Sequence, residues 1–134
     1  MTLLPRNPPG LFPPYRSYSH ALEVPAGARL LFLSGLNGYL ADGQTMPESF
    51  EEQGDVIWQH IGTLLRDAGM DYGDLVSIRT YLADPSYDEA NVGLRVKYLG
   101  AHRPASTVIC CTLLLPHWKL EIEAVAAKVD PAAS

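Results

Sequence analysis

The hydrophobic positions in the first half of the chain predict two strands and a long helix. Residues 17–24 and the continuous apolar run at 30–34 fit strands, and the Pro- and Gly-containing segment between them predicts a turn. We expect these two strands to pair as a hairpin. Apolar residues then recur at helical spacing over 49–68, where Ser49 and Glu52 form the capping-box pattern that opens a helix.

The second half of the chain predicts three further strands and a second helix. A strand is expected over 74–84, a helix from Ser86 to about Leu99, and strands over 106–115 and 119–129. The apolar run 106–115 predicts burial on both faces, whereas 119–129 alternates and should bury one. The order β-β-α-β-α-β-β predicts an α+β domain, a mixed sheet with two helices on one face. Because the other face then needs cover, we expect a homo-oligomer.

The length of the chain and the position of its prolines predict one domain with short extensions. A chain of 134 residues suits a single domain. Five of the 11 prolines precede residue 15, so residues 1–16 are expected to form an extended N-terminal arm. Proline interrupts helices and central strands, which is the reason for this expectation. Residues 17–129 then form the single domain, and residues 130–134 form a C-terminal tail.

Composition and charge narrow the classes of function. The formal net charge is −5 and no basic run occurs, which argues against nucleic acid as a partner. The apolar runs are far shorter than a membrane span, and the proline-rich start does not resemble a secretory signal. Cys110 and Cys111 are neighbours on a predicted strand and point to opposite faces, so we expect no disulfide and a cytoplasmic location. The four histidines lack metal-ligand spacing, so no metal site is expected.

Two glutamates near the C-terminus are the clearest candidates for chemistry. Glu121 and Glu123 are two residues apart on a predicted strand, so their carboxylates share a face. If that face is in solvent, they are ordinary exposed side chains; if a second subunit covers it, such a carboxyl could activate water or carry a proton. Ser34, before Gly35, is either a turn residue or a hydroxyl presented to a ligand. Spacing alone leaves both pairs of alternatives open.

Short motifs follow one another along nearly the whole chain, from Tyr18 to Ala127. They are, in order, Y-S-H-A at 18–21, L-S-G-L at 33–36, E-Q at 52–53, D-L-V at 74–76, Asn91, P-A-S-T-V at 104–108 and E-I-E-A-V-A at 121–126. The last of them is closely similar to an E-I-E-A-I-A pattern. Each motif is weak alone, but their order and spacing resemble the RidA/YjgF family, the reactive intermediate deaminases.

That resemblance implies a fold, an assembly and a reaction. The implied fold is chorismate-mutase-like, and the implied assembly is a homotrimer with a central barrel of three sheets and small-molecule clefts between subunits. Active family members hydrolyse 2-imino or 2-enamino acids to 2-keto acids and ammonium, without a cofactor or metal. By resemblance, Glu121 is the catalytic residue that positions the attacking water. The positions that would line the ligand site are Tyr18, Ser34, Gly35, Asn91, Ser106 and Val108.

The chain departs from the family pattern where a substrate carboxylate would bind. Ser106 stands in place of the family arginine, and Val108 in place of the common cysteine two residues later. A serine has neither the charge nor the forked donors that hold a carboxylate. Arg79, Arg95 and Arg103 are other sources of that charge, although Arg103 precedes a proline and is expected to point elsewhere. Spacing does not choose among them.

The sequence leaves enzymatic activity open. The favoured hypothesis is a RidA-like protein that hydrolyses imine- or enamine-type intermediates to a carbonyl compound and ammonium, with a substrate altered by Ser106. The alternative is a non-catalytic trimeric protein that binds a small metabolite. Some family members carry the label endoribonuclease, and the acidic balance of this chain disfavours that activity.

Overall fold

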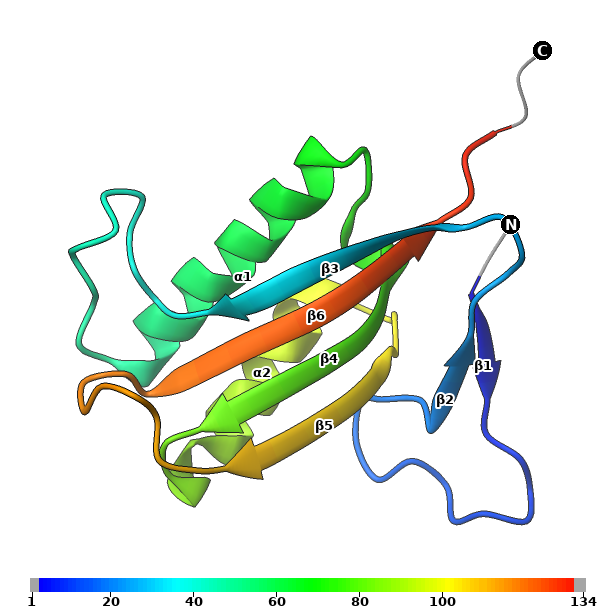
Figure 1. Ribbon diagram of the computed structural model, residues 1–134. Coiled ribbons are helices and arrows are strands. Elements are labelled where there is room, and N and C mark those ends of the chain that lie inside the picture. Colours follow the sequence, from blue (N-terminus) through cyan, green and yellow to red (C-terminus); the bar gives the residue numbers. More distant parts are fainter. Residues whose placement is uncertain (1–2, 132–134) are drawn as a thin grey trace.

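One sheet with two helices on one of its faces forms the body of the protein (Figure 1). The computed structural model describes residues 3–131. Its main elements are β3 (Arg29–Leu36), α1 (Phe50–Asp67), β4 (Leu75–Leu82), α2 (Asp88–Leu99), β5 (Ala105–Cys110) and β6 (Leu120–Lys128). The strands lie in the order β3-β6-β4-β5, and all neighbours are antiparallel except β4 and β5, which are parallel. This mixed sheet confirms the predicted α+β class.

The hydrophobic core lies between the sheet and the helices. On β6, Leu120, Ile122 and Ala124 are buried toward the helices, while Glu121 and Glu123 lie on the opposite face, as predicted. Packing of an apolar face supplies most of the stability of a helix such as α1. The residues of that face are Ile57, Trp58, Ile61 and Leu65. No helix within residues 3–131 has an apolar stretch long enough to cross a membrane.

The ends of the two helices show one correct and one wrong prediction. Ser49 is the N-cap of α1, where its Oγ accepts a hydrogen bond from the Glu52 N–H at 3.1 Å, and this confirms the predicted start. Ser86, in contrast, does not cap α2. The Asp84 carboxylate accepts a hydrogen bond from the Ser86 N–H at 2.8 Å and so caps a short 3-10 turn, η2 (Pro85–Tyr87), which precedes α2. Aspartate is among the strongest N-capping residues, which is why the turn begins two residues early.

The predicted hairpin of residues 17–24 with 30–34 is wrong. Strand β2 (Ala21–Glu23) pairs with β1 (Leu4–Arg6), inside the predicted arm, and the two form a separate antiparallel ribbon beside the sheet (Figure 1). Strand β3 pairs with β6 instead, and this places Leu33 in the core, whereas β2 is mostly exposed. Strand β6 has nine residues and is mostly buried or half-buried, so β3 forms more buried backbone hydrogen bonds with β6 than it could with the three residues of β2. Residues 1–2 of the arm and 132–134 of the tail lie outside the described residues.

The predicted strand 106–115 is shorter and more exposed than expected. It ends at Cys110, and it is not buried on both faces, because the helices cover only one face of the sheet and Thr107 and Ile109 lie on the other. Ile109 is 47% exposed, and Leu114 lies in the turn that follows and is 88% exposed. Cys110 and Cys111 are both free thiols. The apolar run 106–115 therefore includes side chains, such as Ile109 and Leu114, that a single chain leaves exposed.

The sheet face opposite the helices carries exposed apolar side chains. Leu30 and Phe32 of β3 lie on it, and Phe32 is 73% exposed. Arg79 and the two glutamates of β6 share this face, because register partners across a sheet point to the same side. Clustered exposed apolar side chains of this kind mark association surfaces. The expected homo-oligomer remains a prediction.

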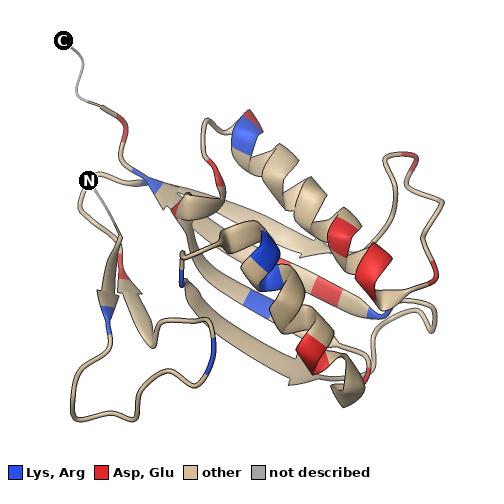
Figure 2. Cartoon of the chain, turned by 180° about the vertical axis from the view of Figure 1, so that it is seen from behind, with Lys and Arg blue, Asp and Glu red and all other residues tan. Residues whose placement is uncertain are grey.

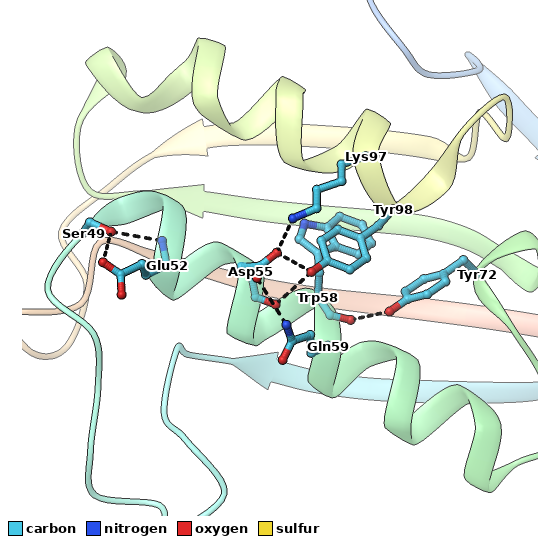
Figure 3. Close-up of polar contacts among 8 residues, drawn as sticks. All are labelled: Ser49, Glu52, Asp55, Trp58, Gln59, Tyr72, Lys97 and Tyr98. Atoms are coloured by element: carbon cyan, nitrogen blue, oxygen red, sulfur yellow. Dashed lines mark hydrogen bonds and ion pairs between the residues drawn. The ribbon is translucent and has the colours of Figure 1, made fainter.

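A polar and aromatic cluster fastens α2 to α1 (Figure 3). The Asp55 carboxylate of α1 accepts hydrogen bonds from the Lys97 Nζ at 2.9 Å and from the Tyr98 hydroxyl, both on α2. The Tyr98 ring stacks on Trp58, with ring centroids 5.7 Å apart. The Tyr72 hydroxyl donates to the Trp58 carbonyl at 2.8 Å. These contacts join the two helices, so we assign the cluster to stability.

The Tyr98 hydroxyl should make the protein sensitive to alkaline pH. Burial and the hydrogen bond to Asp55 raise the pKa of Tyr98 to about 12. The unfolded chain releases this proton near pH 10, so the folded state binds more protons between about pH 10 and 12. The free energy of unfolding should therefore fall as pH rises through this interval.

Urea denaturation at pH 9.5, 11 and 12 measures this dependence. The Tyr98→Phe variant should show a smaller loss of stability between pH 9.5 and 12 than the wild type. Tyr15→Phe, at a tyrosine that is 80% exposed, should keep the wild-type slope. Equal slopes in all three proteins would contradict the assignment.

Candidate functional site

Glu121 lies directly against Gly35. Strands β3 and β6 pair antiparallel, with a bulge between Leu33 and Leu36 at which Ser34 and Gly35 lie opposite the single residue Glu123. A Cβ at Gly35 would lie 2.6 Å from Glu121 Oε2, so only glycine leaves room for the carboxylate in this position. The bulge and the glycine together bring the carboxylate onto the backbone of β3.

One further side chain orients the Glu121 carboxylate. The Asn37 Nδ2 donates a hydrogen bond to Glu121 Oε1 at 3.1 Å, and both groups are partly buried. Asn37 was not among the residues predicted for the site. The sequence marks Asn37 only by its position two residues after Gly35. That position identifies a site residue only once Glu121 is known to be its hydrogen-bond partner. We call Ser34, Gly35, Asn37 and Glu121 the Glu121 half-site.

The neighbouring carboxylate, Glu123, has different surroundings. It accepts a hydrogen bond from the Tyr81 hydroxyl, and Arg79 lies opposite it on β4. The hydrogen bond to Glu123 and burial raise the pKa of Tyr81 above its usual value. Glu123 is therefore held on the open sheet face by β4, whereas within residues 3–131 Glu121 accepts a side-chain hydrogen bond from Asn37 alone. This difference makes Glu121 the carboxylate available to a ligand.

The remaining predicted residues lie at the other edge of the sheet. Ser106 and Val108 of β5 are register partners of Ile78 and Thr80, so their side chains face the helix layer. Asn91 is buried on α2, the helix that covers this part of the sheet (Figure 1). These residues form a second group at β5.

Tyr18 joins this second group through the chain that enters from the arm. The Ser19 N–H donates to the Pro104 carbonyl at 3.1 Å, and Ser19 bridges to Ala105, which places residue 18 beside the start of β5. The Tyr18 hydroxyl accepts a hydrogen bond from the Tyr15 N–H at 3.2 Å. We call Tyr18, Asn91, Ser106 and Val108 the Ser106 half-site.

One chain does not bring the two half-sites together. The Glu121 half-site lies along β3 and β6, the Ser106 half-site lies at β5, and β4 separates them in the sheet order β3-β6-β4-β5. The edge strands β3 and β5 are on opposite sides of the sheet. Within residues 3–131, one chain therefore does not gather all the predicted residues into a single pocket.

A hollow of about 240 Å³ on the open sheet face is lined by Phe32, Arg79 and Glu123 but not by Glu121, and a larger one lies elsewhere. A cavity of about 690 Å³ opens between the β1–β2 ribbon and the end of the sheet, and of the predicted site residues only Tyr18 lines it. Its cationic groups bind protein carbonyls: Arg103 Nη1 donates to the Gly100 carbonyl at 2.6 Å, and Lys128 Nζ donates to the Gly69 carbonyl at 3.0 Å. This cavity holds no carboxylate placed like Glu121, so we do not assign the chemistry to it.

Comparison with known proteins gives a consistent result. A family model described as Endoribonuclease L-PSP matches residues 11–128. Protein HMF1 of Saccharomyces cerevisiae is 28% identical over 114 residues, which are 85% of this chain and 86% of that protein. A protein of Arabidopsis thaliana named Reactive Intermediate Deaminase A, chloroplastic, is 31% identical over 110 residues, which are 81% of this chain and 57% of that protein.

A solved structure extends the similarity to the fold. The protein YyfB of Yersinia pestis, described as a conserved Rid family protein of unknown function, is similar with a TM-score of 0.84 and 28% identity. The match covers 96% of this chain and 100% of that chain. The range matched by the family model contains all residues of both half-sites, from Tyr18 to Glu121.

Proposed function

Because the chain belongs to the RidA/YjgF family, we propose that it hydrolyses imine- or enamine-type intermediates to a carbonyl compound and ammonium. The observation that carries this proposal is the position of Glu121. Its carboxylate lies on the backbone at Gly35, Asn37 occupies Oε1, and within the described residues Oε2 accepts no hydrogen bond. A carboxylate with one free oxygen is suited to hold and deprotonate a water molecule.

The proposed reaction uses Glu121 as a proton carrier. Water adds to the carbon of the C=N bond, a C–O bond forms, and the π electrons move to nitrogen while Glu121 Oε2 accepts the water proton. Glu121 passes that proton to the nitrogen, which gives a carbinolamine. It then carries the hydroxyl proton of the carbinolamine to the same nitrogen as the C–N bond breaks, so that ammonia leaves and the carbonyl forms. The sum is one imine and one water giving one carbonyl compound and one ammonia, which is protonated in water. No cofactor or metal takes part in the proposed steps.

We place this reaction in a small-molecule cleft between copies of the chain in a homotrimer. The two half-sites at opposite edges and the exposed apolar sheet face support an assembly in which each β3 edge meets a neighbour's β5 edge. Light scattering should then give a mass of about 44 kDa, three times the 14.7 kDa of one chain. A cytoplasmic location is also part of the proposal, and free thiols at Cys110 and Cys111 fit a reducing compartment.

Ser106 supports a second candidate function, a non-catalytic trimeric protein that binds a small metabolite. The family arginine is absent at this position, and Ser106 brings no charge to replace it. The endoribonuclease activity named in the family model is less well supported. Figure 2 shows Lys and Arg spread along the chain and interspersed with Asp and Glu, and the net charge is −5. Binding to a polyanion requires a concentrated basic surface.

A trapped-imine assay separates catalysis from binding. An amino-acid oxidase generates 2-imino acids, semicarbazide traps those that remain, and the amount of semicarbazone is measured with and without the protein. Catalysis predicts a fall in semicarbazone that scales with protein concentration. An unchanged amount, with the protein shown to be trimeric, would favour the binding protein.

A further inference from the structure

The cavity between the β1–β2 ribbon and the end of the sheet is large enough to hold a small molecule. Its volume is about 690 Å³, which lies within the range of roughly 300 to 1,000 Å³ that is typical of ligand pockets. A single chain forms it, and its lining residues come from both ends of the described sequence, from Leu3 to Pro131. Glu121 does not line it, so this cavity is not the place proposed for hydrolysis.

The ribbon contributes apolar side chains to the cavity. Leu3, Pro5 and Leu22 line it from β1 and β2 and the residue before them, and Pro25 lines it from the turn that follows. Figure 1 shows the ribbon beside the sheet rather than within it. A two-stranded ribbon is only marginally stable in water by itself and needs a packing partner. A molecule with an apolar body, bound in the cavity, would be such a partner.

The body of the protein contributes the charged groups. The cations that line the cavity are Arg103, in the segment before β5, and Lys128, at the end of β6. Asp74 is the only carboxylate among the lining residues that the structure describes. The next carboxylate along the chain from Lys128, Asp130, is already paired with Arg29 at 2.7 Å. The lining therefore carries two positive charges against one negative charge.

Both cations keep hydrogen-bond donors that the protein does not use. Arg103 Nη1 donates to the carbonyls of Gly100 at 2.6 Å and His102 at 3.1 Å, whereas within residues 3–131 its Nε and Nη2 donate to no protein group. Lys128 Nζ donates to the Gly69 carbonyl at 3.0 Å and has two further protons. Neither cation forms an ion pair in the part of the chain that the structure describes. Their partners are neutral carbonyls, so an anion would bind to them more strongly than a neutral group.

We propose that this cavity binds a small organic anion with an apolar body. The charged group of the ligand accepts hydrogen bonds from Arg103 and Lys128, and its body packs against Leu22 and the prolines of the ribbon. The site goes beyond the proposed hydrolysis, because it needs one chain only and holds no carboxylate placed like Glu121. The ligand is therefore bound and not converted there.

Two fluorescent probes of matched shape test the site. Anilinonaphthalenesulfonate is an aromatic body with one sulfonate, and phenylnaphthylamine is the same body without the charge. The wild-type protein should bind the sulfonate about tenfold or more tightly than the neutral probe, the difference typical of one charged hydrogen bond. Arg103→Met should abolish this preference by weakening the sulfonate alone. Leu22→Gln should weaken both probes, by about threefold or more, because an apolar contact is lost.

Arg79→Met is the matched control for Arg103→Met. It removes a cation from the hollow on the open sheet face, where Phe32 is also exposed, and it should bind both probes like the wild type. In ¹⁵N-labelled wild-type protein, the sulfonate should also shift the Arg103 Nε resonance, and phenylnaphthylamine should not. That resonance is read without any variant, so the test does not depend on the folding of Arg103→Met.

Three results would overturn the site. One is equal affinity of the wild type for the two probes, and another is an Arg103 resonance that the sulfonate does not move. The third is a preference for the sulfonate that survives in Arg103→Met or disappears in Arg79→Met, which would place the probe elsewhere. Imine hydrolysis enters none of these measurements, so the site and the proposed function can fail independently.

Discussion

Replacing Glu121 by glutamine should abolish imine hydrolysis while leaving the protein folded and able to bind its ligand. The amide keeps the shape of the carboxylate but cannot accept the proton of the attacking water. The expected loss in turnover is roughly 100- to 10,000-fold, the usual contribution of a positioned general base. The trapped-imine assay measures this loss, and titration with pyruvate, a 2-keto acid of the product class, measures binding in the same protein.

Glu123→Gln is the matched control for that change. Glu123 lies two residues away on β6 and on the same sheet face, but it is hydrogen-bonded by Tyr81 rather than placed at Gly35. This variant should keep turnover within a few-fold of the wild type. If both variants lost activity equally, the contact with Gly35 would not set Glu121 apart from Glu123 as the catalytic carboxylate. If neither lost activity, Glu121 would not be the base.

Placing a charge at Phe32 should dissociate the protein and remove its activity together. Phe32 is 73% exposed on the open sheet face, and the proposed assembly buries it against other copies. An aspartate there would have to lose its hydration without a partner, which costs several kcal/mol at every copy of the interface. Phe32→Asp should therefore have the 14.7 kDa mass of one chain by light scattering and show no imine hydrolysis.

Leu64→Asp provides the comparison for Phe32→Asp. Leu64 is also an exposed apolar residue, 41% accessible, but it lies on α1 in the helix layer. This variant should keep both the oligomer and the activity. A monomeric but active Phe32→Asp protein would show that a single chain holds a complete site. An oligomer that survives the charge would place the interface elsewhere.

Local periodicity was enough to predict most elements of the sheet and its helices. The helix over 49–68 has an apolar stripe and a Ser49 cap, and both signals are contained within its own residues. Strand β6 alternates, so its buried and exposed faces follow from the pattern. Strand pairing failed because it depends on distant partners: residues 4–6 pair with 21–23, and β3 pairs with the last strand. A short apolar stretch does not indicate which strand lies beside it.

The candidate site shows the same limit. Ser34, Gly35 and Glu121 were expected from motifs, but the contact of Asn37 with Glu121 spans 84 residues and follows only from the bulge in β3. The sequence raised Arg95 as one of three possible replacement charges, and only burial distinguishes it from Arg79 and Arg103. Separation of the half-sites could not be predicted from spacing, because it depends on strand order.

The most direct test of the account is complementation between two inactive variants, since the central claim is that each site combines half-sites from two copies. Glu121→Gln inactivates one half-site and Asn91→Leu should inactivate the other, and each protein alone should be inactive. The two are unfolded together in equal amounts and refolded, so that mixed trimers form. A site is intact when its Glu121 comes from an Asn91→Leu chain and its Asn91 from a Glu121→Gln chain. Each of these has a probability of one half in an equal mixture, so about one quarter of the sites should regain wild-type turnover. No recovery, in trimers shown by mass to be mixed, would contradict the account, because it would place both groups in a site within one chain.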